Sequence, residues 1–543
     1  AGWKSWFKKK ERAVRSVPRP SLVDPEAIAQ AVREAERDAS SDSARTLRRD
    51  ASRQQEQRSQ QRRAVEVTPE ARTGLNPGHK PVRAKVFVHR KLYKELTDVR
   101  LAQELRSHEG AVWCMQFSHD GQYMASAGQD AMVRIWEVSS RDATPSAAAE
   151  GGEGGLAADG AGSGGLGAAQ TEGAGGGDSD GPSSGGANGG GHREQRQLLF
   201  NEKPLRVWKG HKGDVLDISW SSTLFLLSAS MDKTVRLWHI SMDECLRVFV
   251  HNDFVTSVDF DPADDKYFLS GSLDEKLRVW NIPDHCVADF VDLHEMITAV
   301  AYAPGGDKAV VGSYKGTCRF YRMEAHKFEY VTQIDVRNAR ANPNATGKKI
   351  TGLSFMPGDS QKLLVTSNDS RLRVYDGYTL VCKYKGLQNV NSQIRASFSE
   401  EGDFIVCGSE DECAYVWSTV NSFVPSINPI YTGYRKDKHA SFECFLAHQH
   451  IVSVAIFAPR KHSCVRPTAA ASTEELVSAA QPPAGTSARK LQSQKVINAE
   501  ARAAAAAGVA AVAAAAAVGR VIISAGYSGE IKVFQNFGLP SWI

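Results

Sequence analysis

The stretch LLSASMDKTVRLW (226–238) decides the fold, because closely similar stretches recur along the chain. Each one joins an apolar strand with small residues to a turn at an Asp, and then to an alternating strand that ends in an aromatic residue. Seven copies of one unit indicate a repeat protein rather than several unrelated domains. The other clear copies are FLSGSLDEKLRVW (268–280), MASAGQDAMVRIW (124–136), LLVTSNDSRLRVY (363–375) and IVCGSEDECAYVW (405–417), and weaker copies span 309–321 and 522–534.

The closing aromatic residues set the length of the unit. Clean successive copies are 41 or 42 residues apart, as from Trp238 to Trp280. This length suits four short antiparallel strands, which make one blade of a β-propeller. The two longest spacings enclose a Gly-rich insertion at 143–193 and an Ala-rich insertion at 460–519. We therefore expect an all-β, seven-bladed propeller over residues 82–543, with the two insertions as low-complexity segments.

These repeats resemble the WD40 family, in which a His, a Ser or Thr, an Asp and a Trp form a hydrogen-bonded tetrad in a blade. The resemblance implies that the Ser lies ten residues, and the Asp six, before the Trp. A buried Asp can accept from the His ring, and a buried Trp N–H needs an acceptor. Three copies fit, and these structural tetrads are His108, Ser126, Asp130 and Trp136, then His211, Ser228, Asp232 and Trp238, then His251, Ser270, Asp274 and Trp280.

The remaining copies depart from the tetrad pattern. Lys315 replaces the Asp of the fourth copy, and Val365 and Cys407 replace the Ser of the fifth and sixth. The seventh copy keeps Ser524 but has Ser528 at the Asp position. We expect these blades to be braced differently, while the period keeps the fold.

The chain contains a spare strand that can close the ring. The seventh copy ends at Phe534 with its third strand, and an apolar segment at 99–105 precedes the first copy. Pairing this segment with the last blade would complete four strands and remove an open sheet edge. We predict that residues 99–105 form the outer strand of the seventh blade.

Residues 1–81 are predicted to form a basic, polar arm that is helical or disordered. Residues 1–20 carry seven Lys and Arg against one Glu, so their net charge is +6, and the whole chain is +4. The remainder, 4 minus 6, is −2, which disfavours nucleic-acid binding by the propeller. Trp3, Trp6 and Phe7 beside this charge suit peripheral contact with an acidic membrane. A solvated chain end is the alternative.

The sequence shows no pattern of catalytic, cofactor-binding or metal-binding residues. The nine Cys include no C-x-x-C pair, which favours reduced thiols in the cytosol. Residues 160–165 read G-x-G-x-x-G, but neither a strand before them nor a helix after them is expected. The conspicuous His residues, including His448, fall at tetrad positions rather than at metal-ligand spacing. We expect a non-enzymatic protein without cofactors or metals.

Function is therefore expected on the surface of the ring. The WD40 resemblance implies a partner-binding face built from residues near the start of each first strand and just before each turn Asp. The large apolar members would mark an interface if exposed, whereas packing around the channel is the alternative. The predicted face consists of Trp113, Gln129, Asp214, Leu216, Met231, Phe254, Leu273, Tyr314, Asn368, Glu410 and Tyr527.

A more specific resemblance extends beyond the generic blade residues. The stretches VFVHRKLYKELTDVRLAQEL (86–105), KITGLSFMPGD (349–359) and SFSEEGDFIVCGSEDECAYVWST (397–419) resemble a family of WD-repeat, rabphilin-like effectors and its plant and algal relatives. This implies a cytoplasmic protein that binds a GTP-loaded Rab-type GTPase, peripherally on endosomal or Golgi membranes. The alternative is a general WD40 adaptor, for example a ubiquitin-ligase substrate receptor, with no GTPase partner.

Overall fold

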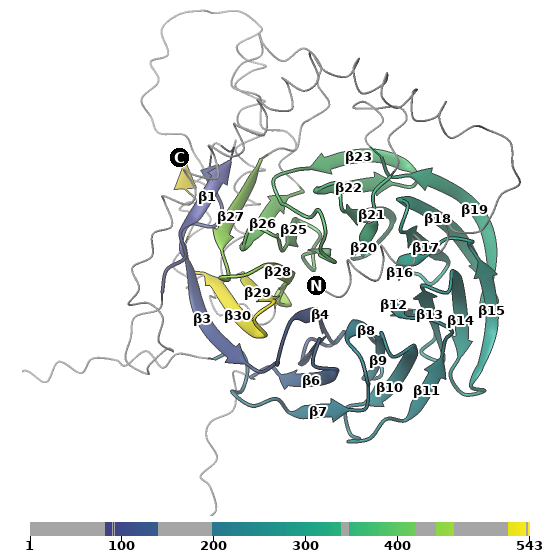
Figure 1. Cartoon of the computed structure of the whole chain (residues 1–543). Helices are drawn as coiled ribbons and strands as arrows, with labels where there is room; N and C mark the ends of the chain where they lie inside the picture. Colours follow the sequence, from purple (N-terminus) through teal and green to yellow (C-terminus); the bar gives the residue numbers. More distant parts are fainter. Residues whose placement is uncertain are drawn as a thin grey trace, which may run out of the picture.

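Each copy of the repeat folds into an antiparallel sheet, and the seven sheets stand around a common centre (Figure 1). The computed structural model describes residues 82–89, 91, 93–139, 198–337, 347–419, 441–460, 520–538 and 541–542. The predicted seven-bladed, all-β propeller is therefore confirmed. The predicted arm at 1–81 and the Gly-rich insertion lie outside the described residues, as does the Ala-rich insertion except for its first residue.

The first four blades follow the repeat in order. Blade 1 holds β4 (Val112–Phe117), β5 (Tyr123–Gly128), β6 (Met132–Glu137) and β7 (Arg206–Lys209). Blade 2 holds β8 (Val215–Trp220), β9 (Phe225–Ser230), β10 (Thr234–His239) and β11 (Arg247–Val250). Blade 3 holds β12 (Val255–Phe260), β13 (Tyr267–Ser272), β14 (Lys276–Asn281) and β15 (Cys286–Asp292). Blade 4 holds β16 (Ile297–Tyr302), β17 (Lys308–Ser313), β18 (Thr317–Glu324) and β19 (Lys327–Asp335).

Blade 5 follows the repeat in order, and blades 6 and 7 each include one strand from the start of the described chain. Blade 5 holds β20 (Ile350–Met356), β21 (Asp359–Ser367), β22 (Arg371–Asp376) and β23 (Thr379–Tyr384). Blade 6 holds β24 (Ala396–Phe398), β25 (Phe404–Cys407), β26 (Cys413–Ser418), β27 (Phe442–Leu446) and, outermost, β1 (Val86–His89). Blade 7 holds β28 (Val452–Phe457), β29 (Val521–Gly526), β30 (Glu530–Asn536) and β3 (Val99–Arg106). A short pair joins β2 (Tyr93–Lys94) to β31 (Ser541–Trp542).

The predicted closure of the ring is present. Strand β3 pairs antiparallel with β30, from Val99 opposite Asn536 to Arg106 opposite Glu530. The first part of the propeller thus supplies the outer strand of the last blade, and blade 7 is complete. In the part of the chain that the structure describes, no helix has the length and apolar composition needed to cross a bilayer.

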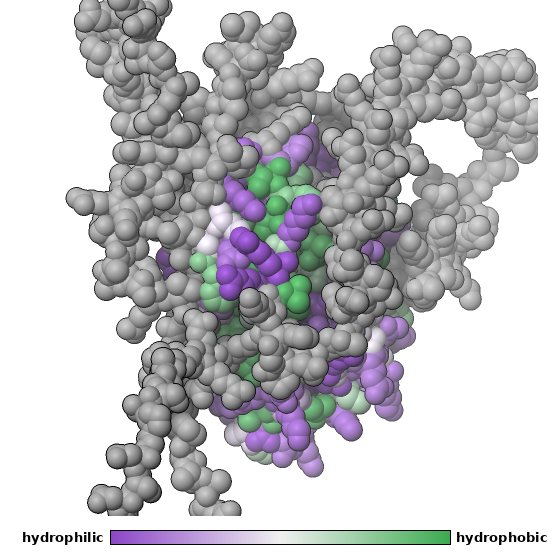
Figure 2. Space-filling model, turned by 90° about the vertical axis from the view of Figure 1, so that its left-hand side faces the viewer, coloured by the Kyte–Doolittle hydropathy of each residue, from purple (hydrophilic) through white to green (hydrophobic). Residues whose placement is uncertain are grey.

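A buried carboxylate fixes the segment between β1 and β3. The side chain of Glu443, on β27, accepts hydrogen bonds from the backbone N–H of Glu95 (2.8 Å) and of Leu96 (2.7 Å). It also pairs with Lys91 Nζ at 2.9 Å. Because Glu443 is fully buried, removal of its charge would leave these donors unsatisfied. Figure 2 shows the side of the ring that carries β1 and β3, where hydrophilic and hydrophobic residues are mixed.

The apolar cores lie between neighbouring blades rather than inside one sheet. Trp208 of blade 1 stacks on Trp238 of blade 2 with ring centroids 5.4 Å apart. The small residues of the repeat make such close packing possible. A Cβ added at Gly271 would lie 2.5 Å from Cγ2 of Ile297 in the next blade, which is too close. The small-residue strand in each copy is thus a requirement of blade stacking.

Candidate protein-binding face

In blades 1 and 2, the four predicted tetrad residues are connected by hydrogen bonds. In blade 2, His211 Nδ1 lies 2.8 Å from Asp232, and Nε2 lies 2.7 Å from Ser228 Oγ. Trp238 Nε1 donates to the same Ser228 oxygen at 2.8 Å. An ionised Asp only accepts, so Nδ1 carries the proton, and Nε2 accepts from the Ser hydroxyl. Hydrogen bonds from the His ring and nearby groups outweigh burial and lower the pKa of Asp232.

Blade 1 repeats this arrangement with a looser His–Asp contact. His108 Nδ1 lies 3.1 Å from Asp130 Oδ2, and Nε2 lies 2.8 Å from Ser126 Oγ. Trp136 Nε1 donates to Ser126 at 3.0 Å. Arg134 Nη1 lies 2.7 Å from Asp130 and therefore shares the carboxylate with the His ring.

The third predicted tetrad is present only in part. His251 Nε2 contacts Ser270 at 2.8 Å, and Trp280 Nε1 donates to Ser270 at 2.8 Å. Asp274 does not complete it, because Arg278 holds that carboxylate through two contacts of 3.1 and 2.8 Å. His251 Nδ1 is buried without a hydrogen-bond partner in the structure. The prediction that Asp274 braces His251 is corrected by this geometry.

Blades 4 and 7 replace the Asp differently. In blade 7, His448 Nε2 keeps its contact with Ser524 at 2.9 Å, while its Nδ1 has no partner in the structure. In blade 4, Glu295 takes the place of the turn Asp. Its buried side chain accepts hydrogen bonds from Ser313 Oγ at 2.8 Å and from the backbone N–H of Lys315 at 2.9 Å. A carboxylate thus still caps the turn, although it comes from a different position in the repeat.

Similar hydrogen bonds mark one face of the ring in all seven blades. In six blades, the residue before the turn Asp, or its equivalent, donates its backbone N–H to the carbonyl directly before the first strand, and in blade 6 Glu410 donates to the carbonyl of Gln388, eight residues before β24. These bonds measure 2.8 to 3.2 Å. They place seven of the predicted residues at equivalent positions around the ring, namely Gln129, Met231, Leu273, Tyr314, Asn368, Glu410 and Tyr527.

The predicted residues are not equally accessible. Leu216 and Leu273 are buried, so these two side chains add no surface to the face, and their inclusion is corrected. For these two residues, the burial agrees with the packing alternative rather than with an exposed interface. Gln129 and Tyr527 are exposed. The half-buried members are Trp113, Asp214, Met231, Phe254, Tyr314, Asn368 and Glu410.

An aromatic cluster brings three blades together on this face. Trp113 of blade 1 donates its indole N–H to Asp214 Oδ2 of blade 2 at 3.1 Å. Tyr527 of blade 7 meets Trp113 edge-on, with ring centroids 5.3 Å apart, and is 38% exposed. Burial raises the pKa of Asp214 and that of Tyr527 above their usual values. An accessible aromatic pair beside a carboxylate is typical of interface hot spots.

Glu410 has a structural role that its position did not reveal. Its Oε1 accepts from the backbone N–H groups of Val390 (3.2 Å), Asn391 (2.8 Å) and Ser392 (2.8 Å). Asn368 Nδ2 also donates to the carbonyl of Val390 at 3.2 Å. These bonds hold Val390 at 58% exposure on the loop between blades 5 and 6. Sequence analysis missed Val390 because its loop lies outside the repeated stretch.

The central channel is crossed by an ion pair. Arg395 of blade 6 contacts Asp217 of blade 2, three blades away around the ring. The other Asp217 oxygen accepts from Ser257 Oγ at 2.6 Å and from the backbone N–H of Val258 at 3.0 Å, both in blade 3. Arg395 also reaches the carbonyl of Thr256 at 3.3 Å. These contacts connect opposite sides of the ring and give the channel a structural role.

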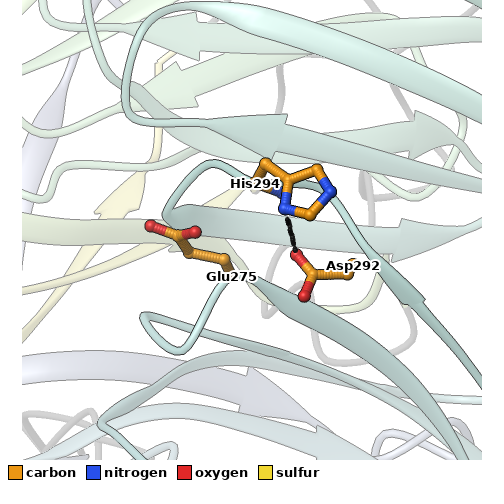
Figure 3. A group of neighbouring side chains, drawn as sticks. All are labelled: Glu275, Asp292 and His294. Atoms are coloured by element: carbon orange, nitrogen blue, oxygen red, sulfur yellow. Dashed lines mark hydrogen bonds and ion pairs between the residues drawn. The ribbon is translucent and has the colours of Figure 1, made fainter.

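One group of possible metal ligands lies on blade 3 (Figure 3). Ligand atoms of Glu275, Asp292 and His294 lie within 4.8 Å of one another, and His294 Nδ1 is 3.2 Å from Asp292. Asp292 and His294 are exposed and already contact each other. Exposed groups of this kind are common without an ion, so the geometry gives no reason to assign a metal here.

Comparison with known proteins agrees with this architecture. The signature described as "WD domain, G-beta repeat" (WD40) matches four segments, which together cover parts of blades 1, 2, 3, 5, 6 and 7. WD40 propellers generally act as non-catalytic scaffolds for protein interactions. The matched segments are residues 100–137, 202–239, 243–281 and 381–418.

Curated relatives match most of the described chain. WD repeat-containing protein 44 of Xenopus laevis is 40% identical over 466 residues, which are 85% of this chain and 47% of that protein. An uncharacterized WD repeat-containing protein of Schizosaccharomyces pombe is 29% identical over 57% of this chain and 48% of its own length. The 2-deoxy-glucose resistant protein 2 of Saccharomyces cerevisiae is 28% identical over 62% and 45%. The chain spans about half the length of these relatives.

Proposed function

Because the chain is a WD40-repeat propeller similar to WD repeat-containing protein 44, we propose that it is an effector scaffold for a GTP-loaded, Rab-type small GTPase. The proposal places it in vesicle trafficking at endosomal or Golgi membranes. The similarity to WD repeat-containing protein 44 and the resemblance to rabphilin-like effectors support the class of partner. The observation that carries the binding surface is the aromatic pair of exposed Tyr527 and half-buried Trp113 beside Asp214.

The chemistry of this cluster suits a partner that changes shape with its nucleotide. The γ-phosphate of GTP orders the switch loops of a small GTPase, and hydrolysis releases them. A rigid aromatic anchor discriminates between ordered and disordered loops, because its contact energy is realised only against a formed surface. Asp214 holds the Trp113 indole in place, so the anchor needs little reorganisation on binding.

The test is a binding measurement with the full chain and purified Rab-type GTPases loaded with a non-hydrolysable GTP analogue or with GDP. We expect binding only to the GTP form, and Tyr527→Ala should weaken it at least about tenfold. Tyr378→Ala is the matched control, because Tyr378 is an exposed Tyr on the outer side of blade 5. Its affinity should equal that of the parent chain, while its melting temperature should fall slightly, because Tyr378 meets Phe320 of blade 4 edge-on with ring centroids 5.0 Å apart.

Binding without nucleotide dependence would contradict the effector proposal. It would favour the alternative of a general adaptor, such as a substrate receptor of a ubiquitin ligase. Equal loss of binding in the Tyr378→Ala control would show that the Trp113–Tyr527 cluster is not the contact site.

The proposal extends to a cytoplasmic location with peripheral membrane contact through residues 1–20. Their net charge of +6 and three aromatic side chains suit an anionic lipid surface. The full chain should co-sediment with vesicles that contain phosphatidylserine, and replacement of Lys8, Lys9 and Lys10 by Gln should reduce this. Equal sedimentation with neutral phosphatidylcholine vesicles would exclude an electrostatic contact.

A further inference from the structure

The outer strands of blades 3 and 4 expose apolar side chains along a free sheet edge. On β15, Phe290 is 54% exposed, and on β19, Tyr330 is 59% exposed with Val331 beside it also exposed. Strand β19 is nine residues long and pairs only with β18 among the described strands. Long, exposed edge strands are templates for pairing with another chain unless something covers them.

Blade 6 shows what covers such an edge in this molecule. Its outer strand β27 pairs antiparallel with β1, from Val86 opposite Phe445 to His89 opposite Phe442. The His89 ring stacks on the Phe442 ring with centroids 4.9 Å apart. The added segment is short, apolar and followed by Lys91, which pairs with the buried Glu443 of the edge strand. A basic, apolar, extended segment therefore fits the outer edge of a blade in this fold.

The edges of blades 3 and 4 have the complementary charge. Strands β15 and β19 carry four acidic side chains, Asp289, Asp292, Glu329 and Asp335, against one basic side chain, Lys327. Across residues 255–335, fourteen acidic and eight basic side chains give a net charge of −6. Neighbouring Arg side chains neutralise part of this, since Arg322 lies 3.1 Å from Glu329 and Arg337 lies 3.7 Å from Asp335.

The two outer strands form one continuous surface. Asp289 on β15 accepts a hydrogen bond from the backbone N–H of Phe328 on β19 at 2.8 Å. This bond uses the first part of the β19 edge and joins it to blade 3. The remaining edge runs from Tyr330 to Asp335 on the outer side of blade 4 (Figure 1). It contains one bulge at Val331, because Tyr330 lies opposite Tyr321 and Thr332 lies opposite Phe320.

We propose that the outer edge of β19 is a docking site for an extended, basic segment of a partner protein, which adds to blade 4 as a fifth strand. Backbone pairing along residues 330–335 supplies the contact, as β1 does on blade 6. Apolar side chains of the partner pack on Tyr330 and Val331, and its Lys or Arg side chains meet Glu329 and Asp335. This rim is separate from the Trp113–Tyr527 cluster, so either proposal can fail without the other.

The test uses the full chain and a labelled peptide with the sequence RAKVFVHRK, which copies residues 83–91. We expect saturable binding, and hydrogen exchange should show new amide protection in β19. Tyr330→Lys should weaken binding at least about tenfold, because it removes the apolar contact and repels the basic peptide. Val250→Lys is the matched control, since Val250 is 69% exposed on the outer strand of blade 2, and it should bind as the parent chain does.

Several results would overturn the proposal. These are the absence of saturable binding up to about 1 mM peptide, protection confined to β27 through displacement of β1, or an equal loss with Val250→Lys. A parent chain that dimerises in sedimentation, with Tyr330→Lys restoring the monomer, would assign the edge to a second copy of this chain instead. A peptide with Glu in place of its Lys and Arg should not bind, and equal binding of that peptide would refute the charge argument.

Discussion

Blades 2 and 3 contain the same four tetrad residue types with the same Ser–Asp–Trp offsets, yet they are held together differently. In blade 2, Asp232 contacts His211, and Thr234 Oγ1 donates to the same carboxylate at 2.6 Å. In blade 3, Arg278 takes both oxygens of Asp274, and Nδ1 of His251 is left without a partner. The same residue types thus build a complete hydrogen-bond chain in one blade and an interrupted chain in the next, where the His lies two residues further from the Asp along the sequence.

The difference coincides with a change of the residue two positions after the Asp. Thr234 orients the carboxylate in blade 2, and the His–Asp distance is 2.8 Å. Blade 1 has Met132 at this position, and the distance lengthens to 3.1 Å. Blade 3 has Lys276, which lacks a hydroxyl, and the contact is lost to the Arg side chain. Across these three blades, the His–Asp contact thus varies together with a fifth residue that the family pattern does not include.

The largest expected difference between the two blades is their response to acid. Burial lowers the pKa of His251 to about 4, whereas the ordinary value is 6.5. Below pH 6.5 the His251 ring is protonated in the unfolded chain but stays neutral in the folded chain. The contribution of this ring to the free energy of unfolding is therefore complete above pH 6.5 and is lost as the pH falls toward 4. We expect His251 alone to remove about 2 to 3 kcal/mol of unfolding free energy between pH 7 and pH 4.5.

Urea unfolding at the two pH values measures this effect. His251→Gln keeps a hydrogen-bonding side chain but cannot titrate, so its stability should fall less over the same pH range than that of the parent chain. Parallel pH dependence in the two proteins would mean that His251 protonates normally in the folded state.

Coupling within each tetrad should separate the blades by a smaller amount. A double-mutant cycle of His211→Ala with Asp232→Ala should give a coupling of about 2 kcal/mol, the value of a buried hydrogen bond to a charged group. The same cycle on His251 and Asp274 should give less than about 0.5 kcal/mol. A cycle on Asp274 and Arg278 is the positive control in blade 3. Equal coupling in both His–Asp pairs would show that the two tetrads are alike in solution.

The repeat made the fold and its closure predictable. Strand composition, the turn Asp and the aromatic spacing specify each blade locally, and the seventh copy was the one that ended without a fourth strand for residues 99–105 to supply. The tetrad members also followed from spacing. Their bonds did not, because competition between His251 and Arg278 for one carboxylate depends on side-chain geometry.

Contacts between segments that are distant in the chain could not be predicted from the sequence. Arg395 and Asp217 are 178 residues apart in the chain, and Lys91 and Glu443 are 352 apart. Each looks like an ordinary charged residue until the ring brings its partner near. For the candidate face, the spacing placed the residues before the turns at matching positions around the ring, but the burial of Leu216 and Leu273 and the exposure of Val390 could not be read from it.

The smallest expected effect tests the fifth residue directly. Lys276→Thr places a hydroxyl where Thr234 lies in blade 2, so that Asp274 can turn one oxygen toward His251. We expect the pKa of His251 to rise, because the carboxylate stabilises the protonated ring, and stability at pH 7 to increase by up to about 1 kcal/mol. The reciprocal change, Thr234→Lys, should lower stability by a similar amount. Both are read by urea unfolding, and an NMR titration follows the ring of His251. If the pKa of His251 does not change in Lys276→Thr, then Arg278 alone keeps Asp274 away from His251. In that case the contact between His211 and Asp232 in blade 2 does not depend on Thr234.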